Sequence, residues 1–449
     1  MGNADLIFAK ASGAGKAGVA VFRLSGEGAI TLARKISNVP LVPRYASLAT
    51  IIDPRDGTPI DSGLVILFPG PESFTGEDVA ELQLHGSSAV EKSLYAALQH
   101  EGARPADPGE FTRRALINGK LDLAQVEGLA DLIDAETIVQ RKQALGQLGG
   151  RLSKVADGWR DRLLAVLTPL EADIDFPDEE DVPAAIAAKA GPAMAVLIAE
   201  LEDYLATAGA ARQVREGLRV VLVGPPNAGK SSLLNSLLAD ERAIVSDTPG
   251  TTRDVVEARL DVRGVPVTLI DTAGLRDTSE DAIEIEGMRR TRMEVERADI
   301  VLIVLDSTTD LDLQALVDDF RKDVSRETSL IAVLNKSDLP NAKTEIDLGI
   351  PSLSLSAKTQ DGTDVLIERL VDGIAEQGLS GVQLTRERHE LSVREAVQSL
   401  SAAVAKIESA PELAAEDVRM AARSLGAITG AVDVEEVLGQ IFSSFCIGK

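Results

Sequence analysis

One stretch of the sequence has the residues and spacing needed to hold a nucleoside triphosphate. The segment Gly224–Ser231 fits the pattern G-x-x-x-x-G-K-[ST] and follows an apolar run, Leu218–Val223, that is typical of a buried strand. Glycines let backbone N–H groups wrap around phosphates, and the positive end of the following helix points at them. We expect Lys230 to bridge the β- and γ-phosphates and the Ser231 hydroxyl to bind Mg²⁺.

Two further segments would complete the phosphate site. In Ile270–Gly274, Asp271 is placed to hold Mg²⁺ through water, and the Gly274 N–H is placed to meet the γ-phosphate. In the polar loop Gly250–Asp254, we predict Thr252 as the second Mg²⁺-binding hydroxyl, ordered only when the γ-phosphate is present.

The base is predicted to be guanine. In Asn335–Asp338, the carboxylate of Asp338 can accept from both N1–H and the 2-amino group of guanine, whereas adenine lacks this pair of donors. Ser356–Lys358 would support the base with its backbone. We therefore expect GTP, not ATP, as the substrate. The residues predicted to contact it, besides Thr252, are Ala228, Gly229, Lys230, Ser231, Ser232, Asp271, Thr272, Ala273, Gly274, Asn335, Lys336, Asp338, Ser356 and Ala357.

A water-positioning residue is missing from its usual place. Many GTPases carry a Gln directly after the D-T-A-G segment, and here that residue is Leu275. An aliphatic side chain cannot orient water, so hydrolysis needs another polar group, a cation or a partner. Glu284, Arg276 and Arg253 are the candidates that position alone leaves open.

These motifs need a multidomain α/β + α chain to position them. Residues 1–118 show short strands, Leu6–Ala9, Val19–Leu24, Leu48–Ile52, Leu64–Phe68 and Val79–Leu84, and a helix at 88–99, which predicts an α+β domain. Residues 217–378 alternate strands and helices, as a doubly wound parallel sheet does.

The remaining segments, 119–216 and 379–449, show helical periodicity. Apolar residues from Leu145 to Ile174 predict one long helix with a kink at Pro169, a second helix is predicted near Pro192–Arg215, and a third set from about Arg386. We interpret the two segments as one discontinuous helical domain with a Ras-like phosphate-loop domain inserted in it.

Composition restricts the cellular location and the kinds of partner that we expect. No segment approaches the ~18 apolar residues that cross a bilayer, and we expect no signal peptide, so the prediction is a cytoplasmic protein without a membrane segment. One cysteine cannot form an intramolecular disulfide. The formal charge of −25 disfavours binding of nucleic acid through the bulk surface. Any contact with RNA then needs a local basic patch, a partner protein or recognition of something other than the backbone.

With these elements in place, the whole chain resembles the MnmE (TrmE) family of bacterial tRNA-modification GTPases. The most specific similarity is the terminal Phe445–Lys449, which nothing in nucleotide binding requires. The other matching segments are Phe74–Asp78, Pro108–Phe111, Asp175–Glu180, Pro226–Ser231 and Gly250–Asp254.

The resemblance implies an N-terminal domain similar to tetrahydrofolate-binding domains that mediates a constitutive homodimer. It implies that the chain works with the flavoprotein MnmG to add an aminomethyl or carboxymethylaminomethyl group at C5 of the wobble uridine of certain tRNAs. The added carbon would come from a folate, either 5-formyl- or 5,10-methylene-tetrahydrofolate. A partner that supplies much of the tRNA contact would make the acidic charge less surprising.

The resemblance also assigns residues. Asn227 stands at the position that ligates K⁺ beside the phosphates, with Ser246, Thr248 and Thr251 as the corresponding further ligands, and K⁺ neutralises developing charge as an arginine finger does. Glu284 matches the glutamate that orients the catalytic water, with Glu280 and Glu286 as rivals. The implied catalytic set is Glu284, Lys230, Thr252 and Asn227, and the implied folate set is Arg23, Glu81, Lys120 and, from the partner's tail, Lys449. For Cys446, a role in the modification and a merely buried position stay equal alternatives.

Two other classes of function remain open at this stage. One is a regulatory or ribosome-assembly GTPase switch, which the segment 217–378 fits equally well but residues 1–118 and the tail do not. The other is a folate-dependent one-carbon transferase with a regulatory GTPase domain.

Overall fold

The computed structural model describes residues 5–175, 186–238, 256–271, 292–322, 324–325, 328–372, 374, 383–431 and 448. Contacts between residues divide the chain into two compact units. The first comprises Met1–Ala130, Gln147–Asp161 and Ala422–Lys449, and the second comprises Asp131–Gly146 and Arg162–Ala421. The predicted strands and helices are found in both, whereas the exact domain boundaries stay predictions.

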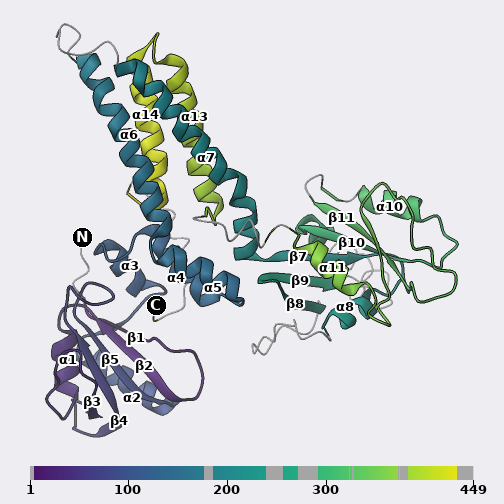
Figure 1. Ribbon diagram of the computed structural model, residues 1–449. Helices are drawn as coiled ribbons and strands as arrows, with labels where there is room; N and C mark the ends of the chain where they lie inside the picture. Colours follow the sequence, from purple (N-terminus) through teal and green to yellow (C-terminus); the bar gives the residue numbers. More distant parts are fainter. Residues whose placement is uncertain are drawn as a thin grey trace. The chain divides into compact units, whose positions relative to one another are not determined.

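The first unit contains a six-stranded sheet of order β3-β4-β5-β2-β1-β6. Figure 1 labels β1 to β5 of this sheet. Its neighbouring strands are antiparallel except for the parallel pair of β1 and β6. The strands are β1 (Ile7–Lys10), β2 (Ala17–Ser25), β3 (Ser47–Ile52), β4 (Pro59–Phe68), β5 (Val79–Gly86) and β6 (Arg104–Pro105). All five strands predicted in this part of the sequence are therefore confirmed.

One face of this sheet carries the core. Alternate side chains such as Phe22 and Leu24 of β2 are buried, because successive residues of a strand point to opposite faces. Helices α1 (Ala29–Ile36) and α2 (Ser88–His100) pack their apolar sides against the same cluster. The α+β prediction is thereby confirmed.

The helical segments differ from the prediction in one respect. The periodic run from Leu145 to Ile174 is not one helix, because α5 (Ile138–Leu148) ends before α6 (Arg151–Asp175) begins. Gly150 adopts a left-handed φ of 75°, a conformation that ends helices, and its N–H bonds back to the carbonyl of Gln147. The prediction of one continuous helix was wrong at this glycine, while α6 does run through Pro169. The other helices of these segments are α3 (Glu110–Ile117), α4 (Leu123–Asp134), α7 (Ile186–Glu216), α13 (Glu387–Lys406) and α14 (Pro411–Thr429).

The second sheet, in the second unit, has the order β12-β11-β10-β7-β9-β8 and is parallel except for the β8–β9 hairpin. Its strands are β7 (Leu218–Val223), β8 (Val256–Val262), β9 (Val265–Asp271), β10 (Ile300–Asp306), β11 (Ser329–Asn335) and β12 (Ser352–Ser354). Helices α8 (Lys230–Leu238) and α11 (Thr363–Leu370) cover one face, and α10 (Leu313–Arg321) covers the other. This is the predicted doubly wound sheet. Such sheets bind ligands at the carboxyl ends of their strands.

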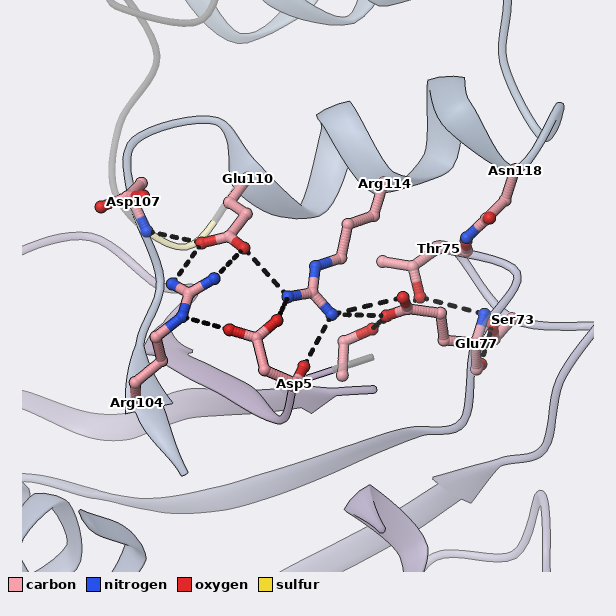
Figure 2. A network of polar contacts seen from close by, with 10 residues as sticks. Asp5, Ser73, Thr75, Glu77, Arg104, Asp107, Glu110, Arg114 and Asn118 are labelled. Carbon is pink, nitrogen blue, oxygen red and sulfur yellow. Dashed lines mark hydrogen bonds and ion pairs between the residues drawn. The ribbon is translucent and has the colours of Figure 1, made fainter. Parts of the chain in front are cut away.

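A polar network ties the N-terminal sheet to α3 (Figure 2). The Glu110 carboxylate, whose side chain is fully buried, accepts hydrogen bonds from Arg104 at 2.6 and 2.8 Å and from Arg114 at 3.0 Å. Arg114 also donates to Glu77 at 3.1 Å and to the Asp5 carboxylate at 2.8 Å. Burial alone would raise the pKa of Glu110, but these hydrogen bonds outweigh it and lower the pKa to about 2.

Glu110→Gln should destabilise the N-terminal unit by about 3 kcal/mol, because it leaves the buried guanidinium of Arg114 and the partly exposed one of Arg104 short of a carboxylate. The pKa of Glu110 is lower in the folded chain than its ordinary 4.5, so its contribution is complete above about pH 4.5 and is lost as the pH falls toward about 2. Calorimetry of the full chain checks this against Glu72→Gln, which changes an exposed carboxylate of the loop between β4 and β5. Equal melting of both variants at pH 7 would contradict it.

Candidate nucleotide site

The predicted phosphate loop lies between β7 and α8, at the carboxyl edge of the second sheet. Two positions of this loop require glycine because atoms of neighbouring strands approach their Cα atoms closely. Gly224 has φ 146°, and a Cβ there would lie 2.1 Å from the backbone oxygen of Val304; Gly229 has φ 96°, and its Cβ would lie 2.2 Å from Nδ2 of Asn335. The loop therefore passes directly against the ends of β10 and β11, where no side chain fits.

Lys230 and Asn227 occupy this loop as the sequence predicts. The Lys230 side chain is 8% exposed, and its Nζ donates to the carbonyls of Gly224 and Pro225, both at 2.9 Å. Its ammonium thus lies inside the loop, at the start of α8, where a helix N-terminus favours anions. Asn227 is exposed and has a left-handed φ of 65°.

The two predicted Mg²⁺ residues that the structure describes lie together. The Ser231 hydroxyl donates to Oδ2 of Asp271 at 2.7 Å, and Asp271 is the last residue of β9. A hydroxyl and a carboxylate are hard oxygen donors of the kind Mg²⁺ prefers, so this pair fits the ion. Within the described residues, no group of three or more His, Cys, Asp or Glu side chains offers an alternative metal site.

The segment predicted to read the base is joined to the phosphate loop by a hydrogen bond of Asn335. This residue is 2% exposed, and its Nδ2 donates to the carbonyl of Ala228 at 2.9 Å. Its Oδ1 accepts from the backbone N–H of Lys336 at 2.8 Å and of Ala357 at 3.0 Å. The side-chain amide therefore joins three segments that are far apart in the sequence.

Asp338, the predicted guanine reader, is exposed at the same edge. The Ser356 hydroxyl donates to its Oδ1 at 2.8 Å and accepts from the backbone N–H of Thr359 at 3.2 Å. The carboxylate is thus oriented by a neighbouring loop while it stays open to a ligand, as reading two N–H donors requires.

Asp306 lies at this edge too, although the sequence motifs did not predict it. It is the last residue of β10, in register with Asn335 of β11, and its carboxylate forms an ion pair of 2.6 Å with Nζ of Lys336. The available signal was an acidic residue directly after the buried run Ile300–Leu305. Polar residues that follow neighbouring parallel strands meet at one edge of the sheet.

Several predicted residues lie outside the described part of the chain. They are the K⁺ ligands Ser246, Thr248 and Thr251, the switch residues Thr252, Thr272, Ala273 and Gly274, the water-positioning candidate Glu284, and Cys446 and Lys449 of the tail. Their roles stay predictions.

Two of the residues predicted to bind folate lie on the N-terminal sheet. Arg23 of β2 and Glu81 of β5 are in register, and the guanidinium donates to Oε1 of Glu81 at 2.8 and 3.0 Å. The Arg23 guanidinium also lies over the rings of Phe74 and Phe111, at 5.3 and 5.8 Å from their centres. Lys120 is exposed just after α3.

The loop that carries Phe74 is held from two sides. The Thr75 hydroxyl shares a hydrogen bond of 2.7 Å with Ser25, and the Thr75 carbonyl accepts from Asn118 at 2.7 Å. Figure 2 shows Asn118 and Thr75 beside the network around Arg114. Aromatic rings, a paired guanidinium and a nearby ammonium offer stacking and polar contacts of the kind a pterin with an anionic tail would need.

No helix in the described ranges is long and apolar enough to span a membrane.

Comparisons with known proteins agree with this arrangement. The family model for the MnmE helical domain matches residues 123–446, and that for the N-terminus of the GTP-binding protein TrmE matches residues 6–120. The tRNA modification GTPase MnmE of Paramagnetospirillum magneticum is 48% identical over 450 residues, which cover 99% of this chain and 100% of that protein. The same-named protein of Phenylobacterium zucineum is 48% identical over 456 residues, with 99% and 100% covered.

Among solved structures, the G domain of the T. maritima FeoB iron transporter matches 36% of this chain and 98% of its own, with 28% identity and a TM-score of 0.26. The full-length identity to curated relatives and the match of both family models confirm the predicted resemblance: the chain belongs to the MnmE family of tRNA modification GTPases.

Proposed function

We propose that this GTPase works in the cytoplasm with the flavoprotein MnmG to install an aminomethyl or carboxymethylaminomethyl group at C5 of the wobble uridine of certain tRNAs. The observation that carries the proposal is the likeness to tRNA modification GTPases across 99% of the chain, which includes the N-terminal sheet and not only the nucleotide site. A regulatory switch alone would not need that sheet.

In the proposed nucleotide cycle, Lys230 binds the β- and γ-phosphates, and Ser231 and Asp271 hold Mg²⁺ together with Thr252. The bound ion would neutralise charge on the phosphate oxygens. Support comes from the Ser231–Asp271 contact of 2.7 Å and from the position of the Lys230 ammonium within the loop.

Asp338 is proposed to select guanine. In Asp338→Asn, the amide would donate to the 2-carbonyl of xanthine and accept from its N1–H, whereas guanine would face a donor with its own 2-amino group. We expect kcat/KM for GTP to fall about a thousandfold and XTP to become the better substrate. Turnover of both nucleotides measures this, with the exposed Glu345→Gln as the matched control. An unchanged preference would remove Asp338 from this role.

K⁺ is proposed to assist hydrolysis, because Leu275 replaces the Gln that orients water in many GTPases. Asn227 would ligate the ion, with Ser246, Thr248 and Thr251, and Glu284 would orient the water. The exposed amide of Asn227, in a left-handed turn of the phosphate loop, supports this assignment.

Turnover should be about tenfold or more faster in KCl than in NaCl, because K⁺ would stabilise charge that develops between the phosphates. Asn227→Ala should abolish the difference and keep GDP binding, whereas Asn235→Ala, at an exposed position of α8, should keep it. Equal rates of the unaltered chain in both salts would exclude this use of K⁺.

Arg23, Glu81 and Lys120, with Lys449 of a second copy, are proposed to bind a 5-formyl- or 5,10-methylene-tetrahydrofolate. A homodimer would form through the sheet face that bears Leu48 and Leu64, a cross-strand pair of β3 and β4 that is 70% and 37% exposed. Sedimentation of the full chain as a monomer would contradict the dimer.

A strain without this chain should lose the C5 modification of wobble uridine, which mass spectrometry of tRNA nucleosides detects. The unaltered chain should restore it. Arg23→Ala should not, although its GTP turnover stays within about twofold, because Arg23 belongs to the other unit. Arg113→Ala, on the exposed side of α3, is the control. Unchanged wobble uridines in the deletion strain would overturn the proposed function.

A further inference from the structure

The carboxylate of Asp306 lies at the edge of the nucleotide site and contacts the base-reading segment. Its Oδ2 is 2.6 Å from Nζ of Lys336, and the two side chains are 27% and 33% exposed. Lys336 stands between Asn335, which joins the phosphate loop, and Asp338, which is proposed to read guanine.

Asp306 is itself held in a single orientation. Its Oδ1 accepts from the backbone N–H of Thr308 at 2.9 Å and from the Thr308 hydroxyl at 2.6 Å. Oδ2 is left to face the lysine. Burial would raise the pKa of Asp306, but the hydrogen bonds from Lys336 and Thr308 and the charge of Lys336 together lower it, so the carboxylate is ionised at neutral pH.

The ion pair can stabilise an unfavourable backbone conformation of Lys336. Lys336 has a left-handed φ of 68°, which costs a side-chain-bearing residue about 1 kcal/mol or more. This turn directs the chain from the end of β11 to Asp338. A conformation that is unfavourable locally persists when neighbouring contacts hold it.

We propose that Asp306 is a positioning residue of the guanine site: through its ion pair with Lys336 it holds the segment Asn335–Asp338 in the ligand-binding conformation before the nucleotide arrives. A preformed segment binds more tightly because ordering costs nothing at the moment of binding. The inference rests on the guanine-reading role proposed for Asp338. It adds Asp306 as the residue that fixes the position of Asp338 before the nucleotide binds.

The first measurement is the affinity of the full chain for a fluorescent GDP and a non-hydrolysable GTP analogue. Asp306→Asn should weaken both on the order of tenfold, the loss expected for one charge-assisted contact. At saturating GTP, kcat should stay unchanged, because a contact at the base binds substrate and transition state equally. Asp310→Asn removes the same charge from an exposed position four residues further on and should bind as the unaltered chain does.

A double-mutant cycle tests whether Asp306 acts through the lysine. Lys336→Met should weaken binding, and adding Asp306→Asn to it should cost less than about twofold more, because the partner is already gone. Thr308→Ala removes the hydroxyl donor to Oδ1 but keeps the backbone N–H donor and the charge of Asp306. It should give a smaller loss in the same direction, and it serves if Asp306→Asn fails to fold.

Three results would overturn the proposal. They are unchanged affinity in Asp306→Asn and Thr308→Ala, an undiminished further loss in the Lys336→Met background, and a fall in kcat with affinity intact. If the proposed tRNA function were wrong, these nucleotide affinities would not change. If Asp338 did not select guanine, the unaltered chain would already bind another base as tightly as guanine.

Discussion

The nucleotide site depends on one side-chain amide, that of Asn335. Its Nδ2 bonds the Ala228 carbonyl of the phosphate loop, while its Oδ1 holds the N–H groups of Lys336 and Ala357. Because the amide is buried, each of these contacts is made in a medium where an unmet polar group costs about 1–3 kcal/mol. The distance between the segment proposed to read the base and the phosphate loop is therefore set by the length of a single side chain. The position of the Asn335 amide also requires glycine at position 229, since any Cβ there would collide with Nδ2.

The N-terminal unit uses ion pairs where the nucleotide site uses an amide. Arg114 binds Asp5, Glu77 and Glu110, and so connects the start of β1, the loop after β4 and α3. Buried ion pairs contribute little net stability, but removing one partner is costly, so such a network specifies an arrangement more than it stabilises it. Here the specified feature is the loop that presents Phe74 to Arg23. The two units thus share a principle: polar groups near each proposed ligand are already bonded within the protein.

Sequence reasoning could predict the position of segments whose residues are contiguous in the chain, while their roles in binding stay predictions. The phosphate loop, Asp271 and Asn335–Asp338 are short segments at strand ends, and the structure brings their described residues to one edge of the sheet. It failed where a contact depends on register or on distance along the chain. Asp306 meets Lys336 only because β10 and β11 pair at Asp306 and Asn335, and Arg114 meets Asp5 across 109 positions. The helix break at Gly150 was missed for another reason: apolar periodicity continued across it, while the left-handed glycine was the stronger signal.

The paired arginines also bear on how an acidic chain works on tRNA. With 46 Lys and Arg against 71 Asp and Glu, the chain has few cations to spare for a phosphate backbone. Arg23, Arg104 and Arg114 are each bound to carboxylates, and Lys336 is bound to Asp306. Releasing any of them to a phosphate would leave a partly or fully buried carboxylate without its partner. These side chains therefore hold the proposed ligand sites in shape. A proposed division of labour follows, in which the flavoprotein partner supplies much of the contact with the tRNA backbone and this chain supplies the GTP cycle and the folate site.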